Sequence, residues 1–309
     1  MDFNGLLLPF CFIGLYFVLE AADWGLSVAA PYVCRNEEES KALLGLFKPG
    51  WDGHELWLLL GVLSLEAALS QAGSSWKGMA LLGPAGLGAL FRLIGCFAKG
   101  SMARPIFIKG MSLFSIFALF VMSLVISSFL HTEGAMVSAL GIFLAIWMIL
   151  AVFQMGTLYG ACKVVNPLGE RCRAAFLVSG IVGLVLHLIS VGLLYVNAGD
   201  VYQYGYLLWI ALGMDVLLFL SAFALTRMRQ ALAGLIAFHL SLISGMCLYM
   251  SAASSVTTVT QVVDISSGMV FFSGMENTAL LVGAVVLSLA ALGYRLLRKK
   301  EEYAWDDHV

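Results

Sequence analysis

Long apolar runs constrain this chain most, because a helix needs about 20 mostly apolar residues to cross the hydrocarbon core of a bilayer. The 309-residue sequence contains nine such runs, at 5–30, 52–73, 78–98, 106–130, 135–160, 174–196, 205–226, 230–252 and 275–297. Only 12% of the residues are charged and 61% are hydrophobic, whereas soluble proteins have about 25% and about 45–50%. We therefore expect an all-α integral membrane protein of about nine transmembrane helices.

Lysine and arginine fall almost entirely in alternate connections between these runs. Of the 17 basic residues, 15 lie in the connections after runs 1, 3, 5 and 7 and in the C-terminal tail, and only Lys77 lies in an intervening loop. The remaining one, Arg92, lies inside the third run. Since cytoplasmic loops carry the excess of basic residues, the pattern predicts an outside N-terminus, a cytoplasmic C-terminus and an odd number of spans. The dispersed basic residues and the net charge of −2 exclude nucleic acid as a partner.

Counting the runs suggests two four-helix bundles and one peripheral helix. Residues 1–132 would form the first bundle, residues 133–253 the second, and residues 254–309 the ninth helix with a cytoplasmic tail. The six cysteines form no Cys-x-x-Cys pair, so we expect from them neither a disulfide framework nor a metal site.

Ionisable residues within the apolar runs are the main functional signal, because a charge at mid-bilayer costs about 2.5–3.5 kcal/mol even on a lenient scale. Acids outnumber the single arginine among them. Carboxylates without a counter-charge in a low dielectric tend to stay protonated, which suits them for passing protons. The residues concerned are Glu20, Asp23, Asp52, His54, Glu55, Glu66, Arg92, His187, Asp215 and His239.

The acids of the first two runs are spaced to share helix faces. Glu20 and Asp23 stand three residues apart, and Asp52 and Glu55 repeat that spacing. Glu66 returns to nearly the same face about three turns, or roughly 16 Å, beyond Glu55. With the predicted orientation, the first pair lies in the cytoplasmic half of the membrane and Asp52 lies at the inner mouth of the second helix. The spacing therefore predicts a proton entrance from the cytoplasm, with Glu66 deeper in.

Structural roles for the same residues stay open. Asp52 could cap the second helix and interact with its dipole, and Arg92 could form a structural ion pair with one of the acids. Asp215 could be paired with a neighbouring helix. His187 and His239 could be axial haem ligands, although buried histidines more often hydrogen-bond to a neighbouring helix and neither has a second ligand at a useful spacing.

Two short motifs resemble subunit II of the cytochrome bd quinol oxidases. Residues 50–57 (Gly-Trp-Asp-Gly-His-Glu-Leu-Trp) resemble the Trp-Asp-Gly-Asn signature that opens the second helix of that family. Residues 20–25 (Glu-Ala-Ala-Asp-Trp-Gly) resemble its Asp-Gly-Phe-Asp-x-Gly motif. Weaker similarities lie at 91–92, 154–173 and 264–267.

This resemblance implies a two-subunit quinol oxidase, in which a partner, subunit I, carries haems b and d and the quinol site. The present chain would be haem-free, would bind no metal, and would conduct protons from the cytoplasm for the reduction of dioxygen to water. The family's proton-path acid falls on Asp52, and Trp57 falls where the family is associated with oxygen access. The chain departs from the family at His54, where asparagine is usual, and at Glu66, which has no usual counterpart.

The predicted relay starts at Asp52 and continues through Glu55, Glu20 and Asp23 toward the haems of the partner. The resemblance also implies a bacterial or archaeal cytoplasmic membrane, with quinol and dioxygen as substrates of the complex. It allows small single-helix accessory subunits and a structural quinone in this subunit.

Two other classes of protein compete with this interpretation. A proton-coupled secondary transporter would use buried acids equally well, but transporter sites are typically built from broken helices in two repeated halves. The sequence shows no paired Gly or Pro interruptions of that kind. A b-type cytochrome would use His187 and His239. A transporter would function alone in vesicles, and a cytochrome would show a haem spectrum as a single chain.

Replacing the acid at the predicted inner mouth tests the relay. Asp52→Asn is expected to slow oxygen reduction by the complex and to leave its haem content intact, because the change removes a proton acceptor and no haem ligand. Oxygen consumption and absorption spectra of the purified complex measure the two effects. Unchanged turnover would remove Asp52 from the path.

Overall fold

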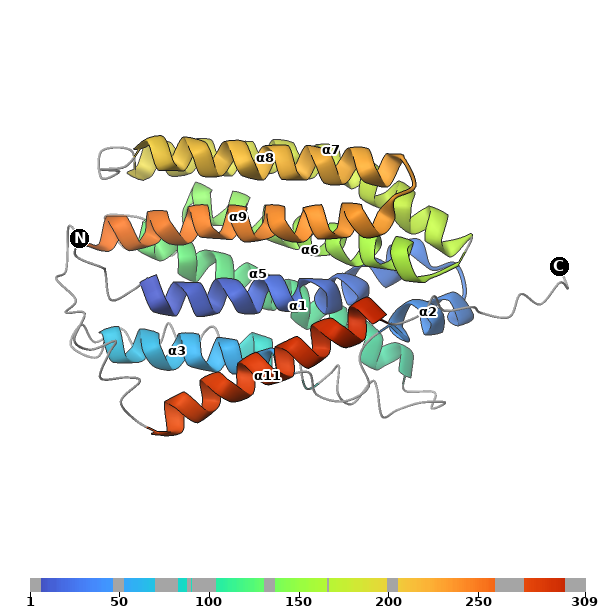
Figure 1. Cartoon of the computed structure of the whole chain (residues 1–309), viewed down its shortest axis with the longest axis horizontal. Helices are drawn as coiled ribbons and strands as arrows, with labels where there is room; N and C mark the ends of the chain where they lie inside the picture. Colours follow the sequence, from blue (N-terminus) through green and yellow to red (C-terminus); the bar gives the residue numbers. More distant parts are fainter. Residues whose placement is uncertain are drawn as a thin grey trace, which may run out of the picture.

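The described part of the chain is a bundle of long helices (Figure 1). The computed structural model describes residues 7–46, 53–69, 83–87, 90, 104–130, 137–165, 167–198, 205–258 and 275–297. Its labelled helices are α1 (Leu7–Val33), α2 (Glu37–Leu44), α3 (Glu55–Leu69), α5 (Arg104–Leu130), α6 (Ala139–Lys163), α7 (Leu168–Ala198), α8 (Gly205–Arg227), α9 (Ala231–Thr258) and α11 (Met275–Leu297). In Figure 1, α7 and α8 lie at one edge of the bundle and α3 and α11 at the other.

Six of these helices, α1 and α5 to α9, are long and apolar enough to cross a membrane. This supports the predicted all-α integral membrane class. The helix α3 has 15 residues, or about 22 Å at 1.5 Å per residue, and α11 contributes a shorter apolar stretch at Ala279–Tyr294. The run predicted at 78–98 lies mostly outside the described residues, so the count of nine spans stays a prediction.

The first helix, α1, lies at the centre of the bundle and packs against α3, α5, α6 and α9. Its aromatic side chains Phe10, Tyr16 and Phe17 are at most 1% exposed, which buries them in a core made by these neighbours. Through α1, helices of both predicted bundles are in direct contact. The division at residues 132 and 253 remains a prediction.

The crossing of α1 and α6 depends on two glycines that face each other. A Cβ atom on Gly25 would lie 2.2 Å from the carbonyl oxygen of Val152, and one on Gly156 would lie 1.9 Å from the carbonyl carbon of Gly25. The two backbones therefore touch, as small residues allow between membrane helices. Because Gly25 ends the motif at 20–25, this crossing fixes the position of Glu20 and Asp23 relative to α6.

Ion pairs join the connections at one end of the bundle. Glu39 of α2 pairs with Arg171 of α7, whose Nε donates to the carbonyl oxygen of Val33 at 3.0 Å. Glu170 lies 3.9 Å from Arg229 in the turn between α8 and α9. Three of the basic connections thus meet at the same end of the bundle. The assignment of that end to the cytoplasm remains a prediction.

The glycine crossing gives a test of the fold. Gly156→Ala is expected to destabilise the protein by about 1–3 kcal/mol or more, because the added methyl group meets backbone that cannot move aside. The measurement is the midpoint of heat denaturation of the purified protein. Gly192→Ala on α7 is the matched control, since a Cβ atom there meets nothing within 4 Å. Equal midpoints for the two variants would contradict the close crossing.

Candidate functional site

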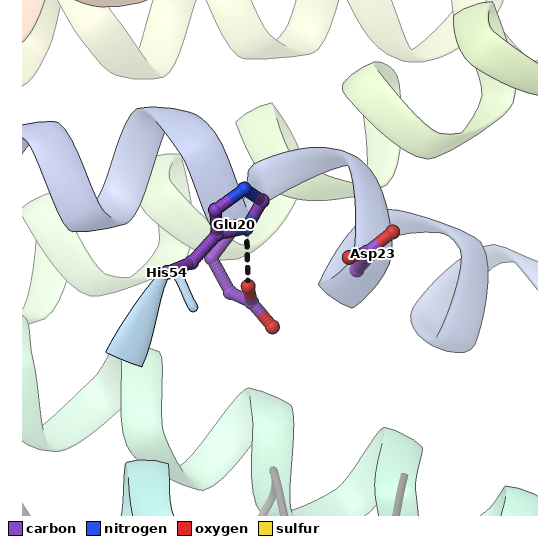
Figure 2. A group of neighbouring side chains, drawn as sticks. All are labelled: Glu20, Asp23 and His54. Carbon is purple, nitrogen blue, oxygen red and sulfur yellow. Dashed lines mark hydrogen bonds and ion pairs between the residues drawn. The ribbon is translucent and has the colours of Figure 1, made fainter. Parts of the chain in front are cut away.

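A buried acid–imidazole contact forms where α1 meets the start of α3. His54 Nδ1 lies 3.1 Å from Glu20 Oε2, and each of the two side chains is 1% exposed. Asp23 follows one turn further along α1 and is 2% exposed. Figure 2 shows the side chains of Glu20 and His54 directed toward each other, with Asp23 on the neighbouring turn of α1. The structure therefore brings together the two motifs that the sequence singled out.

A glycine turns His54 toward α1. Gly53 has a φ of 80°, a left-handed conformation that favours glycine, and a Cβ atom there would lie 2.6 Å from the side chain of Leu287 in α11. The regular helix therefore starts only at Glu55, directly after His54. From this start α3 runs antiparallel to α1, since Gly61 of α3 packs against Ile13.

The contact between Glu20 and His54 lies halfway along the central helix, α1. Glu20 stands midway between the ends of α1 at Leu7 and Val33, so each end is about 20 Å away at 1.5 Å per residue. We expected the second helix to start at the inner membrane surface, and its depth in the membrane stays a prediction. In the structure, α3 starts directly after His54, beside the middle of α1.

The charges at this site favour either an ionised carboxylate or a proton shared between neighbouring side chains. Two buried carboxylates lie close to one imidazole, so the charges of the three groups depend on one another. The first turn of α3 follows His54 directly, and the positive end of its dipole favours negative charge on Glu20. A histidine can donate and accept protons near neutral pH, so the pair can hold a proton and release it.

The same atoms could also hold a cation. Among the described residues, one oxygen of Glu20, one oxygen of Asp23 and one ring nitrogen of His54 lie within 4.8 Å of one another. Imidazole and carboxylate groups are common zinc ligands. The sequence predicted no metal here, and that expectation stays untested.

A cavity of about 50 Å³ adjoins this group, between α1, α6, α9 and α11. One water needs roughly 10–15 Å³ of cavity volume, so this cavity has room for a few waters. Its polar lining includes His54, Lys163, His239 and Ser288. Lys163 ends α6, whose last turn packs beside α2, since a Cβ atom on Gly160 would meet the side chain of Leu43. The cavity thus extends from the His54 contact toward the end of the bundle that carries the basic connections.

His239 has a defined orientation at this cavity. Its Nδ1 lies 2.9 Å from the carbonyl oxygen of Leu235, and because a carbonyl can only accept, Nδ1 carries the proton. In the neutral ring the Nε2 atom is then the acceptor.

The other predicted site residues are placed differently. Asp52 and Arg92 lie outside the described residues. Glu55 and Glu66 are half-buried on α3, and neither belongs to the described group of ligand atoms that meets at Glu20. Trp57 is buried, and its Nε1 donates to Ser288 Oγ at 2.7 Å, which joins α3 to α11.

Sequence reasoning missed the partners of several acids. It did not identify His54 as the partner of Glu20, although this histidine interrupts an otherwise familiar motif. It also did not place Lys163 and His239 beside the site. It left open a partner for Asp215, and the structure pairs this residue with His187 at 2.5 Å between Oδ2 and Nε2.

The two histidines considered as haem ligands do not converge. His187 lines a cavity with Asp215 and Trp147, whereas His239 lines the cavity beside His54. Their positions therefore do not favour a haem held between them.

These features define an integral membrane protein of packed helices with a buried acid–imidazole group at its central helix. No family model matches the chain. A segment of 63 residues, 20% of the chain, is 36% identical to cytochrome bd ubiquinol oxidase subunit 2 of Bacillus subtilis (strain 168), and this match spans 18% of that relative. The structure of bd oxidase from Geobacillus thermodenitrificans has the same fold, with a TM-score of 0.70, 15% sequence identity, and coverage of 95% of this chain and 97% of that chain. A short segment of the chain is thus similar in sequence to that subunit, and the chain shares the fold of a chain of the solved bd oxidase.

A double-mutant cycle tests the contact at the centre of the site. Glu20→Gln and His54→Asn are each expected to lower the heat-denaturation midpoint, because each leaves the other buried group without its charged partner. The double variant should lose less stability than the sum of the losses in the two single variants. The difference, the coupling energy, is expected to be about 0.5–3 kcal/mol. Strictly additive costs would show that the two side chains do not interact.

Proposed function

We propose that this chain is the haem-free subunit II of a bd-type quinol:oxygen oxidoreductase in the cytoplasmic membrane. In this proposal a haem-bearing subunit I carries haems b and d and the quinol site, and the complex reduces dioxygen to water. Support comes from the shared fold along nearly the whole chain and from the local sequence match. His187 and His239, the two histidines considered as haem ligands, line different cavities.

One observation carries the proposal: the segments 20–25 and 50–57, which resemble the family's motifs, meet at the contact between Glu20 and His54. These segments lie far enough apart in the chain that only the fold brings them together. A buried carboxylate with a titratable partner at half the height of a helix bundle is suited to passing protons across a low-dielectric layer.

In the proposed route, protons enter at the end of the bundle that carries the basic connections. They pass Lys163 and the few waters of the adjoining cavity and reach His54. His54 exchanges a proton with Glu20, and Asp23 on the next turn receives it. Asp52, Glu55 and Glu66 are proposed to feed or extend this route from the second helix.

Trp57 has a proposed role in oxygen access. Its indole is anchored by Ser288 and its ring lies 5.8 Å from that of Phe12. These two aromatic rings, between α1 and α3, would guide an apolar gas along the subunit.

A proton-coupled secondary transporter is the second candidate. The observation that favours it is the start of α3 at half-height, since transporter sites commonly lie at the ends of half-helices. Activity of the isolated chain in vesicles, without a haem-bearing partner, would support this candidate over the oxidase subunit.

The proposed route predicts that Glu20→Gln slows oxygen reduction of the purified complex by about tenfold or more, because a positioned proton-transfer group contributes that much or more to rate. Oxygen consumption with quinol is the measurement, and the haem spectrum should be unchanged. Glu37→Gln is the control, since among the described residues this exposed carboxylate on α2 pairs with the neighbouring Lys41 at 3.0 Å.

Full turnover in Glu20→Gln would contradict the route but not the identity of the subunit. Purification of the chain from its native membrane without any haem-bearing polypeptide would contradict the identity itself. The two failures are therefore distinguishable.

A further inference from the structure

The turn between α8 and α9 holds a residue type that its backbone conformation does not favour. The helix α8 ends at Arg227. Beyond it, the amide of Arg229 donates to the carbonyl oxygen of Thr226 at 3.1 Å. The amide of Gln230 donates to the carbonyl oxygen of Leu225 at 2.9 Å. These two bonds together form the Schellman motif, in which the residue at the position of Arg229 is usually glycine.

An arginine at this position is strained. Arg229 has a φ of 64°, and in this left-handed conformation the Cβ atom of an L-residue crowds the following carbonyl oxygen. The strain does not improve the helix end, because both bonds of the motif are made by backbone atoms and glycine would make them equally well. What arginine adds is its side chain, which is 74% exposed. Its role therefore lies outside the turn.

The turn lies where two membrane helices reach the surface of the bilayer. The apolar span of α8 ends at Arg227, and that of α9 starts at Ala231. The side chain of Met228 in the turn is 67% exposed, and Leu232 in the first turn of α9 is 50% exposed. In Figure 1 the turn lies at the same end of the bundle as α2. The guanidinium of Arg229 is thus placed beside exposed apolar groups, at the level of the lipid headgroups.

Two further arginines belong to this region of the surface. Arg227 is exposed in the last turn of α8, two residues before Arg229. Glu170, in the first turn of α7, lies 3.9 Å from Arg229 and accepts a hydrogen bond from Arg173 Nε at 2.9 Å. We call these four residues, Arg173, Arg227, Arg229 and Glu170, the arginine cluster. Its three guanidinium groups and one carboxylate leave an excess of positive charge.

This excess of charge fits a phosphate group. A guanidinium presents its N–H groups as a planar fork that binds phosphate through two hydrogen bonds, and basic side chains at the membrane surface attract anionic lipids. Glu170 is held by Arg173, whereas its distance from Arg229 is too long for a hydrogen bond. The side chains of Arg227 and Arg229 can therefore bind an anion, and Met228 between them can contact an acyl chain.

We propose that the arginine cluster binds the phosphate of an anionic phospholipid, with Arg227 and Arg229 as the residues that hold it. The proposal goes beyond the proposed oxidase function, because the turn lies at the membrane surface and would bind such a lipid in an oxidase subunit or in a transporter. It also gives a reason for a strained arginine where glycine would suffice: the bound lipid offsets the strain of the turn.

The test is the heat-denaturation midpoint of the purified protein, in its native complex and in an uncharged detergent, with increasing amounts of phosphatidylglycerol. The lipid is expected to raise the midpoint of the wild type. Arg229→Asn should need about fivefold more lipid for half of this shift, because one basic side chain near the surface contributes about that factor. Without lipid, this variant should denature no earlier than the wild type, since asparagine adopts the left-handed conformation more readily than arginine.

Two variants and two probes serve as controls. Arg229→Lys keeps the charge and should keep most of the shift. Lys41→Gln removes an exposed charge from α2 at the same end of the bundle, and it should respond to the lipid as the wild type does. Phosphatidylcholine, which has no net charge, and inorganic phosphate, which has no acyl chains, should each leave the midpoint unchanged.

A wild type that phosphatidylglycerol does not stabilise, or equal lipid requirements in the wild type and Arg229→Asn, would overturn the proposal. An equal loss in Lys41→Gln would assign the effect to dispersed surface charge. A shift with inorganic phosphate alone would assign it to a site for free anions. Either result would also overturn it. If Arg229→Asn does not assemble, Arg227→Gln decides, because it should show the same loss of about fivefold and leaves the left-handed residue in place.

Discussion

The contact between Glu20 and His54 is the constraint on which the arrangement of this protein depends. A carboxylate about 20 Å from either end of a membrane helix is costly unless a partner reaches it. The partner, His54, lies directly before the start of α3, beside the middle of α1. Gly53 makes that start geometrically feasible, and the close crossing at Gly25 and Gly156 holds α1 in the position that receives it.

The sequence predicted the helices well because each long apolar run forms its own hydrogen bonds and faces lipid or other helices. The helices α5, α8 and α11 start and end within a few residues of the predicted runs. The short helix α2 was not predicted, because it is polar and lies in a connection, stabilised by the ion pair between Glu39 and Arg171. The left-handed conformation of Gly53, packed against Leu287, was also not predicted.

The acids of the site were recognisable from the sequence, whereas their partners were not. A carboxylate within an apolar run is visible in the sequence, but the helix that supplies its counterpart depends on how the bundle packs. Thus Glu20 and Asp23 were singled out from the sequence, whereas the positions of His54, Lys163 and His239 beside the site emerged from the fold. The same holds for the pair of His187 and Asp215. In both of these contacts between described residues, a histidine from another segment meets a buried acid.

Direct measurement of proton uptake tests the central claim most sharply. The complex would be reconstituted into vesicles, and uptake from the side of the basic connections would be followed with a pH-sensitive dye after oxygen is admitted. For His54→Leu, which has no group that can carry a proton, uptake should become slow while the haem-bearing partner is retained. Uptake at the wild-type rate in this variant would contradict the claim that protons pass through the Glu20–His54 contact.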